Sequence, residues 1–493
     1  MKVLFFNPAN YLEIGIPQGI AILSAILKKD GHQVELFDTT FLKPQNYAAQ
    51  NKEMMAGPAI FKKTAYSLED LVKDDAVVSL EDEFQKHIDR YNPDLIAVST
   101  MTTNYDFAID VMKKVRTKCP VIFGGVHATI SPEEVIAEEC IDMICIGEGE
   151  DALSELCNAM GNGTDYRGTR NLWIKSSHGN ISKNDIRPFV NLDNLPCPDW
   201  SIFDERHLFR PFMGEIYKGG FYISSRGCPA ACTYCVNLAL RNMFKKKCGR
   251  YFRYQKPDTT IAHLSELKEK YGATWFKFGD DTFLLQPLKN LYELAERMKP
   301  LNIQFGCSVR PDTVTEEKVN LVKDMGCVAM SVGIETGNEA IRRNNLNRQI
   351  SNEQLERAFQ IINDHGIRIS TFNLIGLPTE TRENVFETIA FNKKLNVKSA
   401  NVYILYPFPG TKIYLDYNIN CRGQDNRIIP MGAAPVFELS NMSREEVMGL
   451  EKTFNLYLSL PEQLWPVVKL AEERTSQGDI IFNTLSDYAS TIV

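Results

Sequence analysis

The sequence contains little that would place this protein in a membrane or on a nucleic acid. It has no uninterrupted apolar stretch long enough to cross a bilayer. Its apolar start is ended by Asn7-Pro8, well before it reaches the length of a signal-peptide core. Lys and Arg total 55 against 62 Asp and Glu, and this net charge of −7 argues against the basic surface of a nucleic-acid-binding protein. We expect a cytoplasmic protein with no transmembrane segment and no nucleic-acid partner.

The composition is otherwise that of a globular protein. The chain has 493 residues, 44% of them hydrophobic and 24% charged, which is enough for two or three domains. Twelve cysteines in a protein without a secretion signal are expected to be reduced, so clustered ones indicate a metal. Nine are scattered and typical of small core side chains. The other three, Cys228, Cys232 and Cys235, lie within eight residues.

The N-terminal residues alternate short apolar runs with helical patterns. A helix is predicted over Gln18–Lys29, with Gly31 as its stop. Residues 39–90 interrupt the alternation and are predicted to be an insertion over one edge of a sheet. The pattern predicts a Rossmann-like, doubly wound parallel sheet in a domain spanning residues 1–155. Its strand candidates are Lys2–Asn7, Val34–Phe37, Leu95–Ser99, Val121–Phe123 and Ile141–Ile146.

The rest of the chain divides into a linker, a second α/β domain and a helical end. Residues 156–212 are irregular and contain the Pro-punctuated segment Asn191–Trp200, so they are predicted to be a linker. Over residues 213–425 strands again alternate with capped helices, which predicts a partial (β/α)6 barrel. Residues 426–493 are predicted to be mainly helical. The barrel strand candidates are Phe221–Ser225, Trp275–Phe278, Ile303–Ser308, Ala329–Gly333, Ile367–Ile375 and Asn401–Leu405.

The three clustered cysteines follow the first of these strands with the spacing C-x3-C-x2-C. Thiolates this close converge on one metal centre, and iron–sulfur clusters are held by such ligands. Three ligands leave one iron of a [4Fe–4S] cluster open to a small molecule. The alternative is structural zinc with Cys248 as a fourth ligand, but zinc sites usually have two closely spaced cysteine pairs and this segment has one. The loop also lies at the carboxyl end of a barrel strand, where active sites occur.

With this motif, residues 215–410 resemble the radical S-adenosylmethionine (SAM) superfamily. Further segments match it in order: Phe278–Phe283, Cys307–Arg310, Gly333–Gly337, Leu374–Thr381 and Tyr406–Thr411. Taken alone, Asp280-Asp281 is equally typical of a solvated turn, and Tyr234 of a ring packed on the barrel rim. The resemblance implies a [4Fe–4S] cluster on the three cysteines and a set of SAM contacts. These are Tyr234, Asp280, Asp281, Ser308, Arg310, Glu335, Ile375 and Gly376.

The N-terminal domain resembles the cobalamin-binding domain that precedes the radical SAM domain in class B methylases and their relatives. The matching segments are Ile16–Ile20, Asp30–His32, Pro93–Ile96, Gly124–Thr129 and Gly147–Glu150, together with Asp38. The signature D-x-H-x-x-G is absent because Glu35 stands where glycine is needed. We therefore interpret His32 as a turn residue, and His127 as a contact to the nucleotide tail or an amide. The implied cobalamin contacts are Pro17, Gln18, Ser99, Thr100, Gly124, Gly125, His127, Thr129, Glu148 and Gly149.

The resemblance implies a cobalamin-dependent radical SAM enzyme that methylates an unactivated carbon through a 5′-deoxyadenosyl radical. Three other interpretations remain: an oxidative cyclase or rearrangement enzyme with the same cofactors, a sensor without catalysis, and an RNA-modifying enzyme. The ordered SAM segments disfavour the sensor, and the acidic composition disfavours RNA. The resemblance also implies a small-molecule or lipid-like substrate, and an electron donor such as flavodoxin or ferredoxin.

Overall fold

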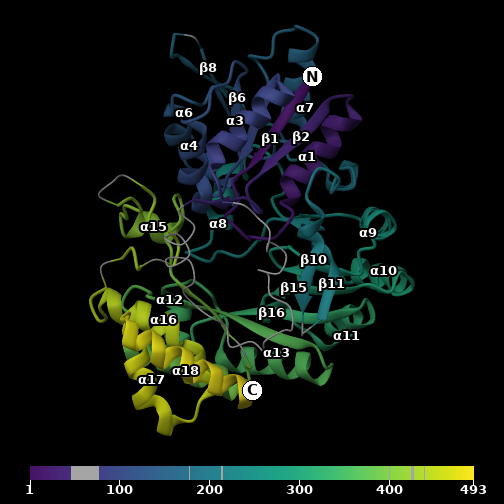
Figure 1. The fold of residues 1–493 in the computed structure, drawn as a ribbon. Coiled ribbons are helices and arrows are strands. Elements are labelled where there is room, and N and C mark those ends of the chain that lie inside the picture. Colours follow the sequence, from purple (N-terminus) through teal and green to yellow (C-terminus); the bar gives the residue numbers. More distant parts are fainter. Residues whose placement is uncertain are drawn as a thin grey trace.

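The computed structural model describes residues 1–45 and 77–492, apart from residues 177, 213–214, 399, 424–426, 433 and 438. Two seven-stranded sheets organise this part of the chain, one in each half (Figure 1). Helices cover both faces of the N-terminal sheet. No helix within the described residues is long and apolar enough to span a bilayer. The predicted α/β fold class is confirmed, with its parallel N-terminal sheet, partial barrel and helical end.

The N-terminal sheet has the strand order β2-β1-β5-β6-β7-β8-β9, and its first five strands are parallel. This is the order of a doubly wound fold, with its switch point beside β1. Along β1, Val3 and Phe5 pack into one core, whereas Leu4 and Phe6 pack into another on the opposite face. Both faces are thus buried, which is why β1 appears in the sequence as a continuous apolar run.

The elements of this half are bounded as follows. The strands are β1 (Lys2–Asn7), β2 (Gln33–Asp38), β5 (Leu95–Ser99), β6 (Val121–Gly124), β7 (Met143–Cys145), β8 (Leu172–Lys175) and β9 (Ile181–Lys183), with a small pair β3 (Lys43–Pro44) and β4 (Val77–Val78). The helices are α1 (Gln18–Lys29), α3 (Leu80–Tyr91), α4 (Tyr105–Met112), α5 (Val126–Ile130), α6 (Pro132–Ala137) and α7 (Glu150–Gly161).

Two assignments in the N-terminal half differ from the sequence prediction. Residues 80–91, assigned to an insertion, form α3, which buries Phe84 and Ile88 against the sheet and is the crossover helix before β5. Residues 46–76 of the same prediction lie outside the described residues. The predicted linker also begins too early, because β8 and β9 form an antiparallel hairpin that extends the N-terminal sheet. Its short strands lack the length and alternation that would separate them from a loop.

The second sheet has the order β10-β11-β14-β15-β16-β17-β18, with six parallel strands and β10 antiparallel at one edge. Its strands are β10 (Phe209–Phe212), β11 (Glu215–Tyr222), β14 (Trp275–Phe278), β15 (Gln304–Val309), β16 (Cys327–Glu335), β17 (Arg368–Ile375) and β18 (Ala400–Ile404); β12 (Ser225–Arg226) pairs with β13 (Arg253–Tyr254). The covering helices are α8 (Val236–Phe244), α9 (Pro257–Tyr271), α10 (Leu288–Met298), α11 (Glu316–Asp324), α12 (Glu339–Asn344), α13 (Asn352–Asp364), α14 (Arg382–Lys394) and α15 (Lys412–Asp416).

The C-terminal helices pack on the far end of the half-barrel (Figure 1). They are α16 (Arg444–Ser459), α17 (Trp465–Ala471) and α18 (Ser476–Ile492). Helix α16 begins with a capping box in which Ser443 and Glu446 satisfy each other's backbone N–H groups. Asn455 on this helix exchanges hydrogen bonds with the backbone of Ala400 on β18. The edge strand of the half-barrel is therefore covered.

Candidate active site between the two sheets

A cavity of about 500 Å³ lies between the carboxyl ends of the two sheets. The loops after β1, β5, β6 and β7 form one wall, and the segments around β12 and the ends of β11 and β14 form the other. Ligands bind at such edges in α/β folds. Seven of the ten predicted cobalamin contacts line this cavity: Gln18, Ser99, Gly124, Gly125, Thr129, Glu148 and Gly149.

The N-terminal wall is made largely of backbone. Gly125 has φ +93°, and a Cβ atom there would lie 2.4 Å from the carbonyl oxygen of Thr100, so a side chain cannot be accommodated without displacing the wall. The Oε1 atom of Gln18 is buried without a hydrogen-bond partner among the described residues, and so is Oγ1 of Thr100. Buried polar atoms are normally satisfied. Because Gln18 lines the cavity, its orphan oxygen fits a ligand that carries amide groups, as a corrin does, whereas Thr100 lies outside the lining.

Three predicted contacts lie outside the cavity lining: Pro17, Thr100 and His127. Pro17 stands at the N-cap of α1, and the backbone of Thr100 is bonded to that of Gly124 and His127. His127 is 1% exposed, with Nδ1 lying 3.1 Å from Thr102 Oγ1 and Nε2 lying 3.4 Å from Glu134 Oε1. Because helix α5 begins directly after Gly125, His127 turns into the domain core.

His32 lies at the opposite end of the same sheet, where β1 and β2 begin. Its Nδ1 atom is 3.3 Å from the amino group of Met1, where β1 begins, and it follows the end of α1. The residue therefore occupies a turn far from the cavity wall, as the missing signature predicts.

The cysteine loop runs from β12 to α8 on the barrel side. Gly227 has φ +85°, and a Cβ atom would lie 2.6 Å from the carbonyl oxygen of Tyr251, which fixes glycine before Cys228. Cys228 and Cys232 are buried, and Cys235 is the half-buried N-cap of α8. Burial raises the pKa of the Cys228 thiol, and that of Cys235 to about 12, and the nearby Cys232 raises both. The three thiols therefore interact.

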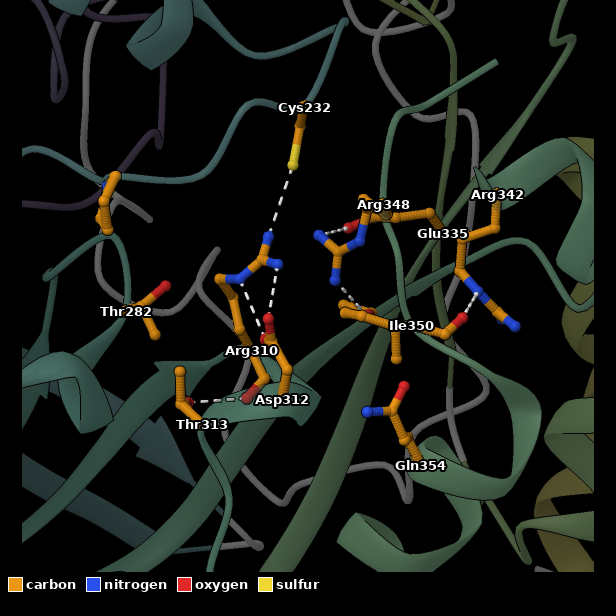
Figure 2. A network of polar contacts seen from close by, with 12 residues as sticks. Cys232, Thr282, Arg310, Asp312, Thr313, Glu335, Arg342, Arg348, Ile350 and Gln354 are labelled. Carbon is orange, nitrogen blue, oxygen red and sulfur yellow. Dashed lines mark hydrogen bonds and ion pairs between the residues drawn. The ribbon is translucent and has the colours of Figure 1, made fainter. Parts of the chain in front are cut away.

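A cation stands beside this loop. The guanidinium of Arg310, at the end of β15, donates from Nη1 to Cys232 Sγ at 3.4 Å (Figure 2). Asp312 fixes the same guanidinium through hydrogen bonds of 3.0 and 2.8 Å. A positive charge held in place favours the thiolate form that a metal requires. Arg310 was predicted as a SAM contact, and the structure places it against a cysteine of the loop.

The thiol arrangement fits a cluster better than a single ion. Within the described residues, no three His, Cys, Asp or Glu side chains converge as one metal ion would require. Cys248, the fourth ligand of the zinc alternative, packs with Phe244 in the apolar core on one face of the N-terminal sheet. A [4Fe–4S] cluster spreads its ligands over separate irons, so Cys228, Cys232 and Cys235 are the residues that would hold it.

The paired aspartates after β14 have different surroundings. Asp280 accepts hydrogen bonds from both serines that precede the cysteine loop, Ser224 and Ser225, and is 2% exposed. Burial raises the pKa of Asp280 to about 6 despite these bonds. Asp281 lines the cavity, where the loss of solvent raises its pKa, and it accepts from Asn237 at 2.7 Å. Asp280 thus ties β14 to the loop, and Asp281 is the one that faces the cavity.

Tyr234 and Glu335 are joined by an arginine. Arg348 Nη1 lies 3.1 Å from Glu335 Oε1 (Figure 2). The same nitrogen lies 3.2 Å from the Tyr234 hydroxyl, and Nη2 donates to Gly333 O. Tyr234 comes from the cysteine loop and Glu335 from the end of β16, so Arg348 fastens the loop to the barrel. The neighbouring Arg342, fully buried, bonds three acceptors around α12 and holds this segment in place.

The remaining predicted SAM contacts lie on β15 and β17. Ser308 is on the inner face of the half-barrel, two residues before Arg310. The side chain of Ile375 packs in the core, so only its backbone is available there. Gly376 has φ +71°, and its N–H, like that of Leu377, donates to Oε2 of the buried Glu380.

Ion pairs connect the two walls of the cavity. Arg226, next to the cysteine loop, contacts Glu148 at 3.0 Å and Glu150 at 2.5 Å, and Arg253 contacts Glu148 at 2.6 Å. Burial opposes the ionisation of Glu148, yet the two arginines hold its pKa below the usual value. Glu148 was predicted to contact cobalamin, but its carboxylate is shared between these arginines and the N–H of Val190.

Two sequence-family models match the chain. Residues 222–391 match the radical SAM superfamily and residues 59–157 match the B12-binding domain. The chain combines a radical SAM domain with a B12-binding domain, as cobalamin-binding radical SAM enzymes do. A methyltransferase of Pyrococcus horikoshii, itself uncharacterized, is 28% identical over 381 residues, which cover 75% of this chain and 79% of that one.

Two further relatives widen the family. An anaerobic magnesium-protoporphyrin IX monomethyl ester cyclase of Rubrivivax gelatinosus is 24% identical over 68% of this chain and 60% of its own. The radical SAM methyltransferase TsrM from Kitasatospora setae, solved with cobalamin and a [4Fe–4S] cluster, has a similar fold. Its TM-score is 0.63 at 17% identity, and the match covers 84% of this chain and 77% of that one. The predicted cofactors agree with both family models and with the groups in that structure.

Sequence reasoning missed the arginines of this radical SAM enzyme's site. Arg226, Arg253 and Arg348 belong to no segment that carries a recognisable function, and their partners are distant in the chain. The one available signal was Arg226, which directly precedes the Gly-Cys of the cysteine motif. The others become visible only once the two sheets are brought together.

Proposed function

We propose that this enzyme methylates an unactivated carbon of a small molecule, using a [4Fe–4S] cluster, SAM and cobalamin. The observation that carries the proposal is the shared cavity. Gly227 and Val236, on either side of the three cysteines, line one cavity together with a glycine-built sheet edge, so groups bound at the two walls would lie close enough to act on one substrate. When bound, the cluster supplies the electron that cleaves SAM, and cobalamin supplies the methyl group.

The chain's own residues would hold the cofactors and orient them. Cys228, Cys232 and Cys235 would hold the cluster, and Arg310 would balance the charge on Cys232. Asp281 is the carboxylate that would receive the amino group of SAM. The glycines of the opposite wall leave room for the corrin, and Gln18, which lines the cavity, would offer to its amides an oxygen that has no partner among the described residues.

The ion pairs between the walls have a further role in this proposal. Arg226 adjoins the first cluster ligand and is bound to Glu148 and Glu150 of the B12-binding domain. This link would fix the separation of the two cofactors. Partly buried pairs of this kind are strong constraints on geometry, because removing one partner leaves a desolvated charge.

Labelled SAM tests the proposal. The full-length protein is reconstituted without oxygen with iron, sulfide and cobalamin, and is reduced by flavodoxin or ferredoxin in the presence of methyl-labelled SAM and candidate substrates. We expect 5′-deoxyadenosine and a labelled product. Absence of 5′-deoxyadenosine from fully reduced, iron-loaded protein would rule the radical mechanism out.

The second candidate is a cyclisation or rearrangement with the same cofactors, and the similarity to the anaerobic cyclase favours it. The same experiment separates the two. A cyclase would release 5′-deoxyadenosine and change the substrate's mass without moving any label from SAM.

A further inference from the structure

Three serines stand side by side on the inner face of the half-barrel. Ser308 on β15 is directly opposite Ser331 on β16, which is directly opposite Ser370 on β17. Residues that pair across parallel strands point to the same face of a sheet. The other face of these strands, which includes Cys307, Met330 and Val332, packs into the hydrophobic core. The serines therefore face the barrel interior.

Lys277 reaches this row from the neighbouring strand. It pairs with Gly306, and its Nζ atom donates to Ser331 Oγ at 3.2 Å, while Ser331 Oγ lies 3.0 Å from Ser370 Oγ. Gly306 has no side chain, so the inner face beside the Lys277 stem stays open.

The lysine has no counter-ion. No carboxylate of the described residues lies within 4.0 Å of its ammonium group, although the side chain is largely buried and burial lowers the pKa of Lys277. A cation in such surroundings is costly unless an anion joins it. Two of the three ammonium donors also have no acceptor in the described part of the chain.

This group lies below the predicted SAM site. Arg310, which contacts Cys232, is two residues beyond Ser308 on β15, a step of roughly 7 Å along the strand. Aromatic side chains border the same face. Phe221 pairs with Lys277 and is 36% exposed, and Tyr403 is 42% exposed beside Phe372, with ring centroids 6.2 Å apart.

We propose that Lys277, Ser331 and Ser370 form an oxyanion subsite that anchors a carboxylate or phosphate group of the substrate. This inference rests on the proposed function and gives its substrate a chemical class, an anion with an apolar portion. The anion would be held at the serine row and the apolar portion would contact the aromatic rings. The reacting carbon would then lie one strand step above, toward the cysteine loop.

The titration of Lys277 tests the subsite directly. Reconstituted protein with an oxidised cluster carries lysines labelled with ¹³C at Cε, and the Lys277 signal is assigned by its loss in Lys277→Arg. The signal is followed against pH alone, with inorganic phosphate, and with octanoate. We expect one of the two anions to raise the midpoint by about one pH unit, because an adjacent negative charge favours the ammonium form.

The controls separate the sources of the effect. A response to phosphate alone supports a phosphorylated substrate, and a response to octanoate alone supports a carboxylate. Methyl octanoate has the same chain without the charge and should leave the midpoint unchanged. Lys277→Met should abolish anion binding, whereas the same change at Lys289, exposed on α10, should preserve it.

Failure of the subsite is distinct from failure of the proposed function. If neither anion moves the Lys277 midpoint, or if methyl octanoate moves it as far as octanoate does, the subsite is wrong even when 5′-deoxyadenosine forms. If the midpoint responds and 5′-deoxyadenosine does not form, the subsite holds and the radical mechanism falls.

Discussion

The two sheets border one cavity but build their walls from different material. The N-terminal wall presents backbone, with Gly124, Gly125 and Gly149 at the strand ends and unpaired oxygens beside them. The barrel wall presents side chains: the carboxylate of Asp281 and the guanidinium groups of Arg226 and Arg253, with the cysteine loop following directly after Arg226 and Gly227. The first wall depends on the absence of side chains at its glycines, whereas the second depends on the functional groups of its side chains. Adding a methyl group should therefore damage one wall, and removing a functional group should damage the other.

The largest expected effect is on the barrel wall. Replacing Cys228 with Ala should reduce the iron content from about four atoms per chain to well under one, because the cluster loses a ligand. Changes around a metal's ligands already cost about 10–100-fold in activity, so loss of the ligand itself should lower SAM cleavage by more than about 100-fold. Iron analysis and the yield of 5′-deoxyadenosine measure both.

Cys248 provides the matched control. It is a buried cysteine that packs among apolar side chains, so Cys248→Ala should keep its iron and its absorption spectrum. If the wild-type protein instead holds zinc in place of iron, and if both Cys228→Ala and Cys248→Ala lose that zinc, the result would support the four-cysteine alternative.

On the N-terminal wall, a single methyl group should weaken cobalamin binding. Gly125→Ala places a Cβ atom against the Thr100 carbonyl in a backbone region that is almost restricted to glycine, at a cost of about 1–3 kcal/mol. If displacement of the wall weakens the binding free energy of cobalamin by about 1.4 kcal/mol, the affinity for cobalamin falls about tenfold. An absorbance titration with hydroxocobalamin measures this change.

Gly31→Ala is the control that separates the effect of backbone strain from the effect of a new contact with the cavity wall. Gly31 also has a positive φ, +86°, but has no atom within 4 Å of its added Cβ and follows α1 at the opposite edge of the sheet. Both variants should be less stable, and only Gly125→Ala should bind cobalamin less tightly. Equal loss of affinity would show that the wall itself is not the binding surface.

The buried arginine of the barrel wall should matter chiefly for stability. Arg348→Met leaves Glu335 buried without its cation, and breaking such a pair costs about 3–5 kcal/mol. On α12, Arg343→Met removes a pair with Glu339 whose arginine is 43% exposed, and should cost less than about 1 kcal/mol. Urea unfolding of the two variants under the same anaerobic conditions gives the comparison, and equal losses would contradict the assigned role of Arg348.

The same contrast explains which parts of the molecule the sequence could predict. Five of the six parallel barrel strands and the cysteine loop are local patterns, and each of these strands was found close to its observed bounds, whereas the first strand, predicted over Phe221–Ser225, is observed as β11 over Glu215–Tyr222. The hairpin β8–β9 was missed because its strands are short and gain their stability from pairing with β7. Local propensity contains no information about such a partner.

At the site, the sequence identified residue types but not their directions. The sequence does not distinguish the roles of Asp280 and Asp281. Only the position of Ser224 and Ser225 decides which of the two carboxylates faces the cavity. His127 was placed by its motif, yet helix α5 turns it into the core. Glu148 was correctly located at the wall, and its two arginines come from another domain, so no local pattern could reveal that its charge is already neutralised.

The last expected effect is gradual and concerns a carboxyl group held by the backbone that directly follows β17. Glu380 is 1% exposed, and burial raises its pKa from 4.5 to about 8, although the N–H groups of Gly376 and Leu377 donate to it. Because the folded state binds this proton more tightly than the unfolded state, the stabilisation is complete below about pH 4.5 and is lost as the pH rises toward 8.

Glu380→Gln cannot titrate, so the advantage of the wild type over this variant should shrink across that window, by at most about 1.4 kcal/mol per pH unit. Urea midpoints of both proteins between pH 5.5 and 8.5 measure the slope, with Glu353→Gln, exposed on α13, as the control that should show none of it. A wild-type advantage that grows with pH would mean that Glu380 is ionised in the folded protein, and that the N–H groups of Gly376 and Leu377 outweigh its burial.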